Sequence, residues 1–139
     1  MKNKKRVVFC AGIIVLIVSF IVPRIKQVIV TNQFREKYKE AVCDTYYSYK
    51  NYISHESKEN YDAFTLKFER LPELSNAMPE STVQNRHFNE LNIMHSLLVE
   101  NSGDIMTKRE LIEDILCRLY KDIDDPNAYA NMFVLRNQM

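Results

Sequence analysis

The chain is 139 residues long, which is enough for one domain plus a short additional segment. It contains only two glycines, where average usage would give about ten, and this argues against an all-β fold, whose tight hairpins favour glycine. The first thirty residues carry six lysines and arginines and no acid, whereas the rest of the chain carries 13 basic and 18 acidic side chains. Because nucleic-acid binding needs a clustered basic face, a mildly acidic domain argues against a nucleic-acid partner.

The first predicted element is a membrane-spanning helix. Residues 7–22 form an apolar run of sixteen positions without a charge, followed by Pro23. Sixteen helical residues rise about 24 Å, which is short of a hydrocarbon core of about 30 Å. Arg6 before the run and Arg24 after it can reach the lipid head groups along their aliphatic stems and bridge this difference. We therefore interpret the run as an anchor that contacts the lipid bilayer.

The anchor divides the sequence into a basic tail at 1–6, a transmembrane segment at 7–23 and an α-helical extramembrane domain at 24–139. A short tail with four basic residues resists translocation, while a long domain crosses a membrane largely regardless of charge. The sequence thus predicts a single-pass protein with a cytoplasmic N-terminus and an extracytoplasmic domain. A cleaved signal peptide is the alternative, although its apolar stretch usually spans about 7–15 residues and ends near an A-x-A-like site, which is missing here.

A long helix is predicted from about residue 24 to residue 51, continuing the anchor as a stalk that becomes the first helix of the domain. Apolar and aromatic side chains recur along one face of it at helical spacing: Phe34, Tyr38, Ala41, Val42, Thr45, Tyr49 and Tyr52. The Ser-His-Glu-Ser sequence at 54–57 predicts an interruption.

The next segment, 61–71, fits two structures. Its apolar residues form a helical stripe, but Phe64, Leu66 and Phe68 also alternate as they would in a strand. We favour a helix because no partner strand is visible. The two prolines in 72–79 predict a loop after it.

Three helix starts follow. Ser81 with Gln84, and Thr107 with Glu110, fit the capping box, and Asp125 before a proline reads as an N-cap. The face of the first of these helices carries Val83, His87, Leu91, Met94 and Leu98. The second helix bears Leu111, Ile112, Ile115, Leu116, Leu119 and Ile123, and the last short helix contains Tyr129, Met132, Phe133 and Arg136. The predicted fold class is all-α: a single N-terminal transmembrane helix that continues into a small bundle of four to five helices.

Four tyrosines lie close together in the long helix: Tyr46, Tyr47, Tyr49 and Tyr52. Tyrosine is favoured at interfaces because it buries a ring and keeps a polar tip. One helix cannot bury all four on the same side. The sequence therefore allows two interpretations of these tyrosines. They are core residues with an isolated ring left at the surface, or they form a surface that contacts a partner.

The domain has two cysteines, Cys43 and Cys117, and each lies well away from the apolar stripe of its helix. In an extracytoplasmic domain such a pair can form a disulfide, and independent packing of two thiols is the alternative.

No residue pattern indicates catalysis, a metal site or a bound cofactor. Metal-binding bundles use Glu-x-x-His pairs on two helices, whereas this chain has the reverse order, His87-x-x-Glu90, once. We therefore expect a non-enzymatic, membrane-anchored interaction or structural module, part of an envelope or cell-surface assembly, that binds a protein partner or itself. The alternatives are a sensor-like domain that binds a ligand or lipid between its helices, and an enzyme with a dispersed site.

Overall fold

The computed structural model describes residues 2–100, 103 and 105–138, and among the side chains before residue 18 it describes that of Val15. Every regular element in these residues is helical, which confirms the all-α prediction. The elements are α1 (Lys2–Ser54), α2 (Lys58–Ala77), α3 (Val83–Arg86), α4 (Phe88–Glu100), the 3-10 helix η1 (Ile105–Lys108), α5 (Arg109–Lys121) and α6 (Pro126–Arg136). The chain divides into two compact units, Met1–Gln33 and Phe34–Met139.

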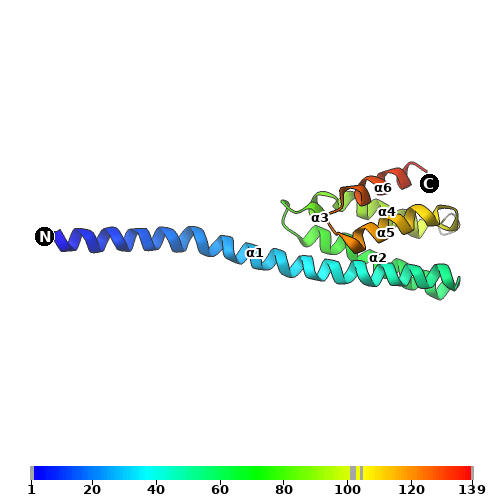
Figure 1. The fold of residues 1–139 in the computed structure, drawn as a ribbon, viewed down its shortest axis with the longest axis horizontal. Coiled ribbons are helices and arrows are strands. Elements are labelled where there is room, and N and C mark those ends of the chain that lie inside the picture. The colour runs from blue at the N-terminus through cyan, green and yellow to red at the C-terminus, as the bar shows by residue number, and fades with distance from the viewer. Residues whose placement is uncertain (1, 101–102, 104, 139) are drawn as a thin grey trace. The chain divides into compact units, whose positions relative to one another are not determined.

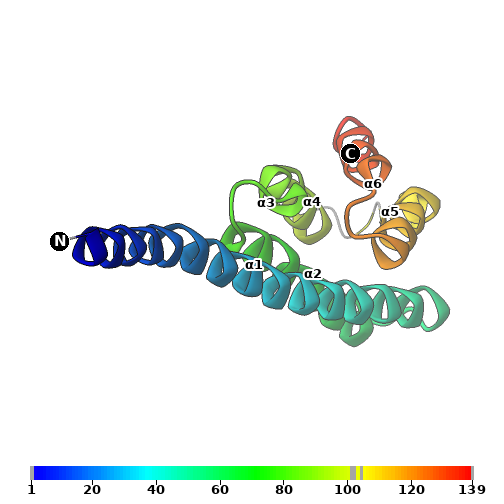
Figure 2. The same ribbon diagram turned by 60° about the vertical axis from the view of Figure 1, so that its left-hand side comes forward.

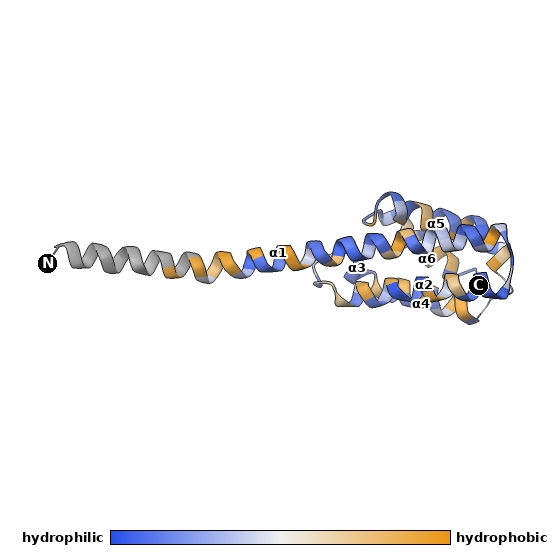
Figure 3. Ribbon diagram, turned by 90° about the horizontal axis from the view of Figure 1, so that it is seen from below, coloured by the Kyte–Doolittle hydropathy of each residue, from blue (hydrophilic) through white to orange (hydrophobic). Residues whose placement is uncertain are grey.

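The first unit consists of the N-terminal part of α1. Nine large apolar side chains between Val15 and Val30 are 41–66% exposed, and Figure 3 shows apolar residues in orange along the described part of this segment. The helix passes through Pro23. Most side chains of the predicted anchor, those of 7–14, 16 and 17, lie outside the described residues. Among the residues that the structure does describe, no helix combines the length and the hydropathy of a bilayer span.

The second unit is a bundle that begins where α1 acquires a buried face, at Phe34 and Tyr38. Helix α2 lies beside the C-terminal part of α1 and runs back along it, and α4, α5 and α6 complete the bundle (Figures 1 and 2). Hydrogen bonds connect the helices: the Tyr61 hydroxyl of α2 donates to the Leu98 carbonyl of α4, and the Tyr49 hydroxyl of α1 donates to the Arg109 carbonyl at 2.8 Å.

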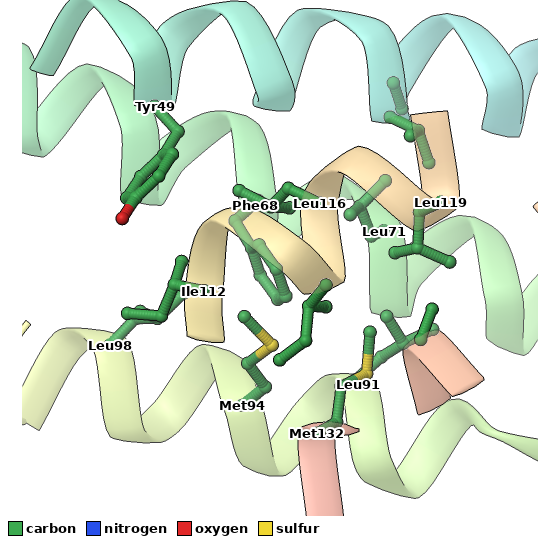
Figure 4. Packing of buried hydrophobic residues seen from close by; sticks show 14 of the residues in the cluster. Tyr49, Phe68, Leu71, Leu91, Met94, Leu98, Ile112, Leu116, Leu119 and Met132 are labelled. Atoms are coloured by element: carbon green, nitrogen blue, oxygen red, sulfur yellow. The ribbon is translucent and has the colours of Figure 1, made fainter. Parts of the chain in front are cut away.

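The core is contributed by α1, α2, α4, α5 and α6 together with Ile105 of η1, and Figure 4 shows part of it from close by. The labelled side chains that meet there are Tyr49, Phe68, Leu71, Leu91, Met94, Leu98, Ile112, Leu116, Leu119 and Met132. Burying each large apolar side chain contributes about 1.5–3 kcal/mol. The face predicted for the long helix is confirmed, because all its members from Tyr38 to Tyr52 are buried.

The segment after the first interruption is a helix, as predicted, and it is longer than predicted. Ser57 caps its start by accepting a hydrogen bond from the Asn60 amide at 3.2 Å. The predicted loop over 72–79 is wrong in its first part, because α2 continues through Pro72 to Ala77. An interior proline costs about 3 kcal/mol or more. Here Leu71, Pro72 and Ser75 are all buried in the bundle, which offsets that cost.

Two predicted helix starts are corrected. Thr82 rather than Ser81 is the first cap: its hydroxyl accepts from the Asn85 amide at 3.2 Å, and the helix breaks at His87 into α3 and α4. The second helix, α5, begins at Arg109 after the turn η1, which buries Ile105, so Thr107 is not its cap residue. The third start is confirmed, because Asp125 accepts from the Asn127 amide at 2.8 Å.

Candidate functional site

Three tyrosines from two helices form an aromatic cluster at the surface of the second unit. The Tyr46 ring of α1 stacks on the Tyr120 ring of α5 with centroids 5.0 Å apart. The Tyr47 ring lies edge-on to both, with centroid distances of 5.5 Å to Tyr46 and 5.9 Å to Tyr120. Tyr47 is 56% and Tyr120 is 44% exposed. We call Tyr46, Tyr47 and Tyr120 the tyrosine patch.

The hydroxyls of Tyr47 and Tyr120 are 3.3 Å apart. This hydrogen bond, together with the charge that ionised Tyr47 would place beside it, raises the pKa of Tyr120. The patch presents ring edges and hydroxyls at the surface, where a partner can contact them. Such amphipathic rings are the side chains that interfaces favour.

The other two tyrosines of the predicted surface, Tyr49 and Tyr52, belong to the core. Both are buried, and each packs against Phe64 of α2, with ring centroids 5.1 Å and 6.5 Å away. Burial raises the pKa of Tyr49 and, to a smaller extent, that of Tyr52. The predicted group thus separates into two core residues and two patch residues, and the third patch member, Tyr120, lies far away in the sequence.

Both cysteines of the domain lie next to the patch in the sequence. Cys43 precedes Tyr47 by one helical turn, and Cys117 precedes Tyr120 by about one turn. They are half-buried free thiols in the structure. A disulfide between them stays a prediction, which gel mobility with and without reduction would test.

A cavity of about 530 Å³ lies between α1 and the end of α5. Its lining is rich in bases and contains one acid: Arg35, Lys39, Cys43, Tyr120, Lys121, Asp122 and Ile123. Its volume falls within the range of small-molecule sites, about 300–1,000 Å³.

A partly buried polar cluster joins α1, α3 and the turn before α6. Gln84 is fully buried, and its Nε2 donates to the Ile123 carbonyl at 2.9 Å and to Asp124 Oδ1 at 2.7 Å. Arg35 donates to both oxygens of the same carboxylate, at 3.0 and 2.5 Å. The Arg35 guanidinium lowers the pKa of Asp124, and that carboxylate in turn raises the pKa of Arg35.

This cluster was missed because Gln84 was interpreted as a capping residue. A signal for its burial was present: Gln84 lies three residues before His87, and the three- and four-residue spacing continues through Leu91 and Met94. Gln84 of α3 therefore continues, across the break at His87, the stripe of buried residues on α4.

Two of the three histidines, His87 and His95, pack against aromatic rings. The His87 ring stacks on Tyr129 at a centroid distance of 4.3 Å, with its Nδ1 3.7 Å from Glu90 Oε2, and His95 stacks with Phe68. Within the described part of the chain, no three potential metal ligands come together.

A second surface feature lies between α4 and α6. It is a hollow of about 150 Å³, which we call the α4/α6 hollow, lined by Asn89, Glu90, Ile93, Met132, Phe133 and Arg136. Phe133 of α6 is 55% exposed, whereas Leu135 of the same helix is fully buried. The last helix therefore leaves a large apolar ring at the surface beside this hollow.

Comparison with known proteins does not assign a function. No protein-family model, curated protein or solved structure matches this chain.

Proposed function

We propose that this chain is a membrane-tethered, non-enzymatic interaction module, whose first unit anchors it and whose second unit binds a protein partner within an envelope or cell-surface assembly. The observation that carries the proposal is the exposure of apolar side chains in the first unit. A helix that is apolar on all sides needs an apolar environment around it. Val15, Phe20 and Val28 project in different directions and all stay exposed.

The sequence supports lipid as that environment. The apolar run at 7–22 has a basic residue at each end, and the first thirty residues contain no acid. Basic flanks suit anionic head groups. The basic tail favours a cytoplasmic N-terminus and an extracytoplasmic second unit.

The tyrosine patch is the surface that we assign to the partner. It combines three rings from two packed helices, so its shape is set by the bundle rather than by a mobile loop. Aromatic residues held in this way often contribute most of the binding energy of an interface.

Crosslinking in the native membrane, followed by identification of the captured protein, tests this proposal. The Tyr47→Ser variant should lose the crosslinked partner while its second unit keeps the wild-type melting temperature. Val99→Ser is the matched control, because Val99 is similarly exposed at 54% and lies on α4. Equal partner capture by both variants, or loss of the chain from the membrane fraction on alkaline extraction of the wild type, would contradict the proposal.

The second candidate function is ligand or lipid sensing, and the cavity between α1 and α5 favours it. Arg35 already pairs with Asp124 and Lys39 with Glu36, whereas Lys121 makes no ion pair among the described residues and suits an anionic ligand such as a lipid head group. A rise in melting temperature on adding phosphatidylglycerol micelles, abolished by Lys121→Ala and unaffected by Tyr47→Ser, would support sensing over partner binding.

A further inference from the structure

The outer face of α2 carries an exposed leucine in an acidic surrounding. Leu66 is 64% exposed and projects away from the buried side of the helix that holds Phe64. Two basic side chains nearby form ion pairs with Asp44 of α1: Lys67 Nζ lies 3.3 Å and Arg70 Nη1 lies 3.8 Å from Asp44 Oδ2. Four exposed acids of α2 have no ion pair within the described part of the chain: Glu59, Asp62, Glu69 and Glu73. We call Leu66 with these four acids the Leu66 face.

The α4/α6 hollow has the complementary character. Its apolar wall is formed by Ile93, Met132 and Phe133. Arg136 lines it, is exposed, and makes no ion pair among the residues described. The hollow also contains one acidic residue, Glu90. Its Oε2 atom is buried and lies 3.7 Å from His87 Nδ1.

The size of the hollow fits one apolar side chain. Its volume is about 150 Å³, and an apolar cavity of about this size accommodates a benzene molecule. A leucine side chain therefore fills it without requiring the two helices to separate. Filling an apolar pocket with one anchoring side chain is a common way for an interface to gain affinity.

The two features lie near the same level along the bundle. The Tyr61–Leu98 hydrogen bond and the Phe68–His95 stack place Leu66 beside the C-terminal half of α4. The His87–Tyr129 stack places the hollow beside the N-terminal half of the same helix. The separation along the bundle is about two helical turns, roughly 10 Å. Two bundles that lie side by side can therefore bring one feature of one copy onto the other feature of its neighbour, and the presence of both copies in one membrane rests on the proposed anchor.

We propose that the α4/α6 hollow binds Leu66 of a second copy of this chain, with the acidic Leu66 face set against Arg136. The contact joins two different surfaces, so each copy keeps one free Leu66 face and one free hollow. Heterologous contacts of this kind build rings or open chains rather than closed dimers. The second units of many copies are thus expected to form lateral arrays on the membrane.

The test uses the full chain reconstituted in vesicles of phosphatidylcholine and phosphatidylglycerol, with an amine-reactive crosslinker. The wild type should give a ladder that extends beyond the dimer. Leu66→Asp removes the leucine but keeps the hollow, and Phe133→Asp alters the hollow but keeps the Leu66 face. Each variant alone lacks one of the two surfaces that the contact needs, so it should be monomeric. A one-to-one mixture of these two variants should give dimers and nothing larger, because each dimer has one intact contact and two blocked ends. Val99→Asp, which alters an equally exposed position elsewhere on α4, should retain the ladder.

A monomeric wild type, a ladder in either single variant, or a mixture without dimers would overturn the proposal. Melting temperatures of the variants identify any that fail to fold. For those, a photoreactive benzoylphenylalanine at position 66 replaces the variant: its product should map to 89–93 or 132–136 of another copy, and mapping elsewhere would also overturn the proposal. Alkaline extraction of the same vesicles is scored separately, so a chain that washes off the membrane contradicts the anchor, while an anchored chain without the ladder contradicts only the array.

Discussion

Asp124 links three parts of the bundle through one carboxylate. It accepts hydrogen bonds from Arg35 of α1 and from Gln84 of α3, and it lies in the turn before α6. The guanidinium of Arg35 lowers the pKa of Asp124 below its ordinary value of 3.8. A carboxyl group whose pKa is lower in the folded than in the unfolded state stabilises the fold at pH values above the unfolded pKa, and this contribution is lost as the pH falls through the folded pKa.

Asp124→Asn should therefore lower the free energy of unfolding at neutral pH by about 2 kcal/mol, since it leaves Arg35 without its charged partner. The loss should shrink as the pH falls below 3.8, because the wild-type carboxyl then becomes protonated, first in the unfolded chain and at lower pH in the folded chain as well. Urea unfolding of both proteins at pH 7 and at acid pH measures this. Asp44→Asn removes an exposed carboxylate that pairs with Lys67, and it should change the free energy of unfolding by less than about 0.5 kcal/mol. Equal effects of the two substitutions would show that the Asp124 cluster does not hold the bundle.

The hydrogen bond within the tyrosine patch can be tested by removing single hydroxyl groups. Tyr47→Phe removes the phenol that lies 3.3 Å from the Tyr120 hydroxyl but keeps the ring. The pKa of Tyr120 should fall toward its ordinary value of 10.0, because the hydrogen bond with Tyr47 is the main cause of its increase. NMR titration of ring-labelled tyrosine measures this. Tyr46→Phe, whose ring stacks on Tyr120 without that hydroxyl contact, should produce a smaller shift, and an equal shift would contradict the arrangement of the patch.

At the scale of elements, the sequence predicted what local chemistry determines. The faces of α1, α4 and α5 follow from helical periodicity, and the start of α6 follows from Asp125 before a proline. The errors occurred where the bundle overrides local preference. Pro72 stays inside α2 because its neighbours are buried, and the second capping box gave way to the turn η1 that buries Ile105.

The corrected start of α3 gives a prediction with a built-in control. The Thr82 hydroxyl accepts from the Asn85 amide, so Thr82→Ala should lower the free energy of unfolding by about 1 kcal/mol. Ser81→Ala alters the residue that the sequence alone pointed to, and it should leave that free energy within about 0.5 kcal/mol of wild type, because Ser81 is exposed. Thermal or urea unfolding compares the two variants. A larger loss of unfolding free energy in Ser81→Ala than in Thr82→Ala would show that Ser81, as the capping box predicts, is the N-cap.

At the scale of the whole molecule, the tyrosine patch shows what one sequence cannot supply. Tyr46 and Tyr47 were visible as members of a local group, but Tyr120 joins them only because α5 packs along α1. The Leu66 face and the α4/α6 hollow likewise depend on which faces the bundle leaves uncovered. Periodicity identifies the side of each helix that is buried, whereas the pairing of helices decides which outward residues become neighbours.

The two-unit division leads to a prediction for the anchor. Val15 lies near the middle of the apolar run at 7–22, and a lysine at the centre of a membrane helix costs about 2.5–3.5 kcal/mol on insertion scales. Val15→Lys should reduce the fraction of the chain that resists alkaline extraction from membranes several-fold. Val30→Lys adds the same charge to the same unit but beyond the run, and it should leave that fraction unchanged. Both variants should keep the wild-type melting temperature, because the core of the second unit begins after Gln33. If Val15→Lys and Val30→Lys behave alike on extraction, the run at 7–22 is not the part of the chain that holds it in the bilayer.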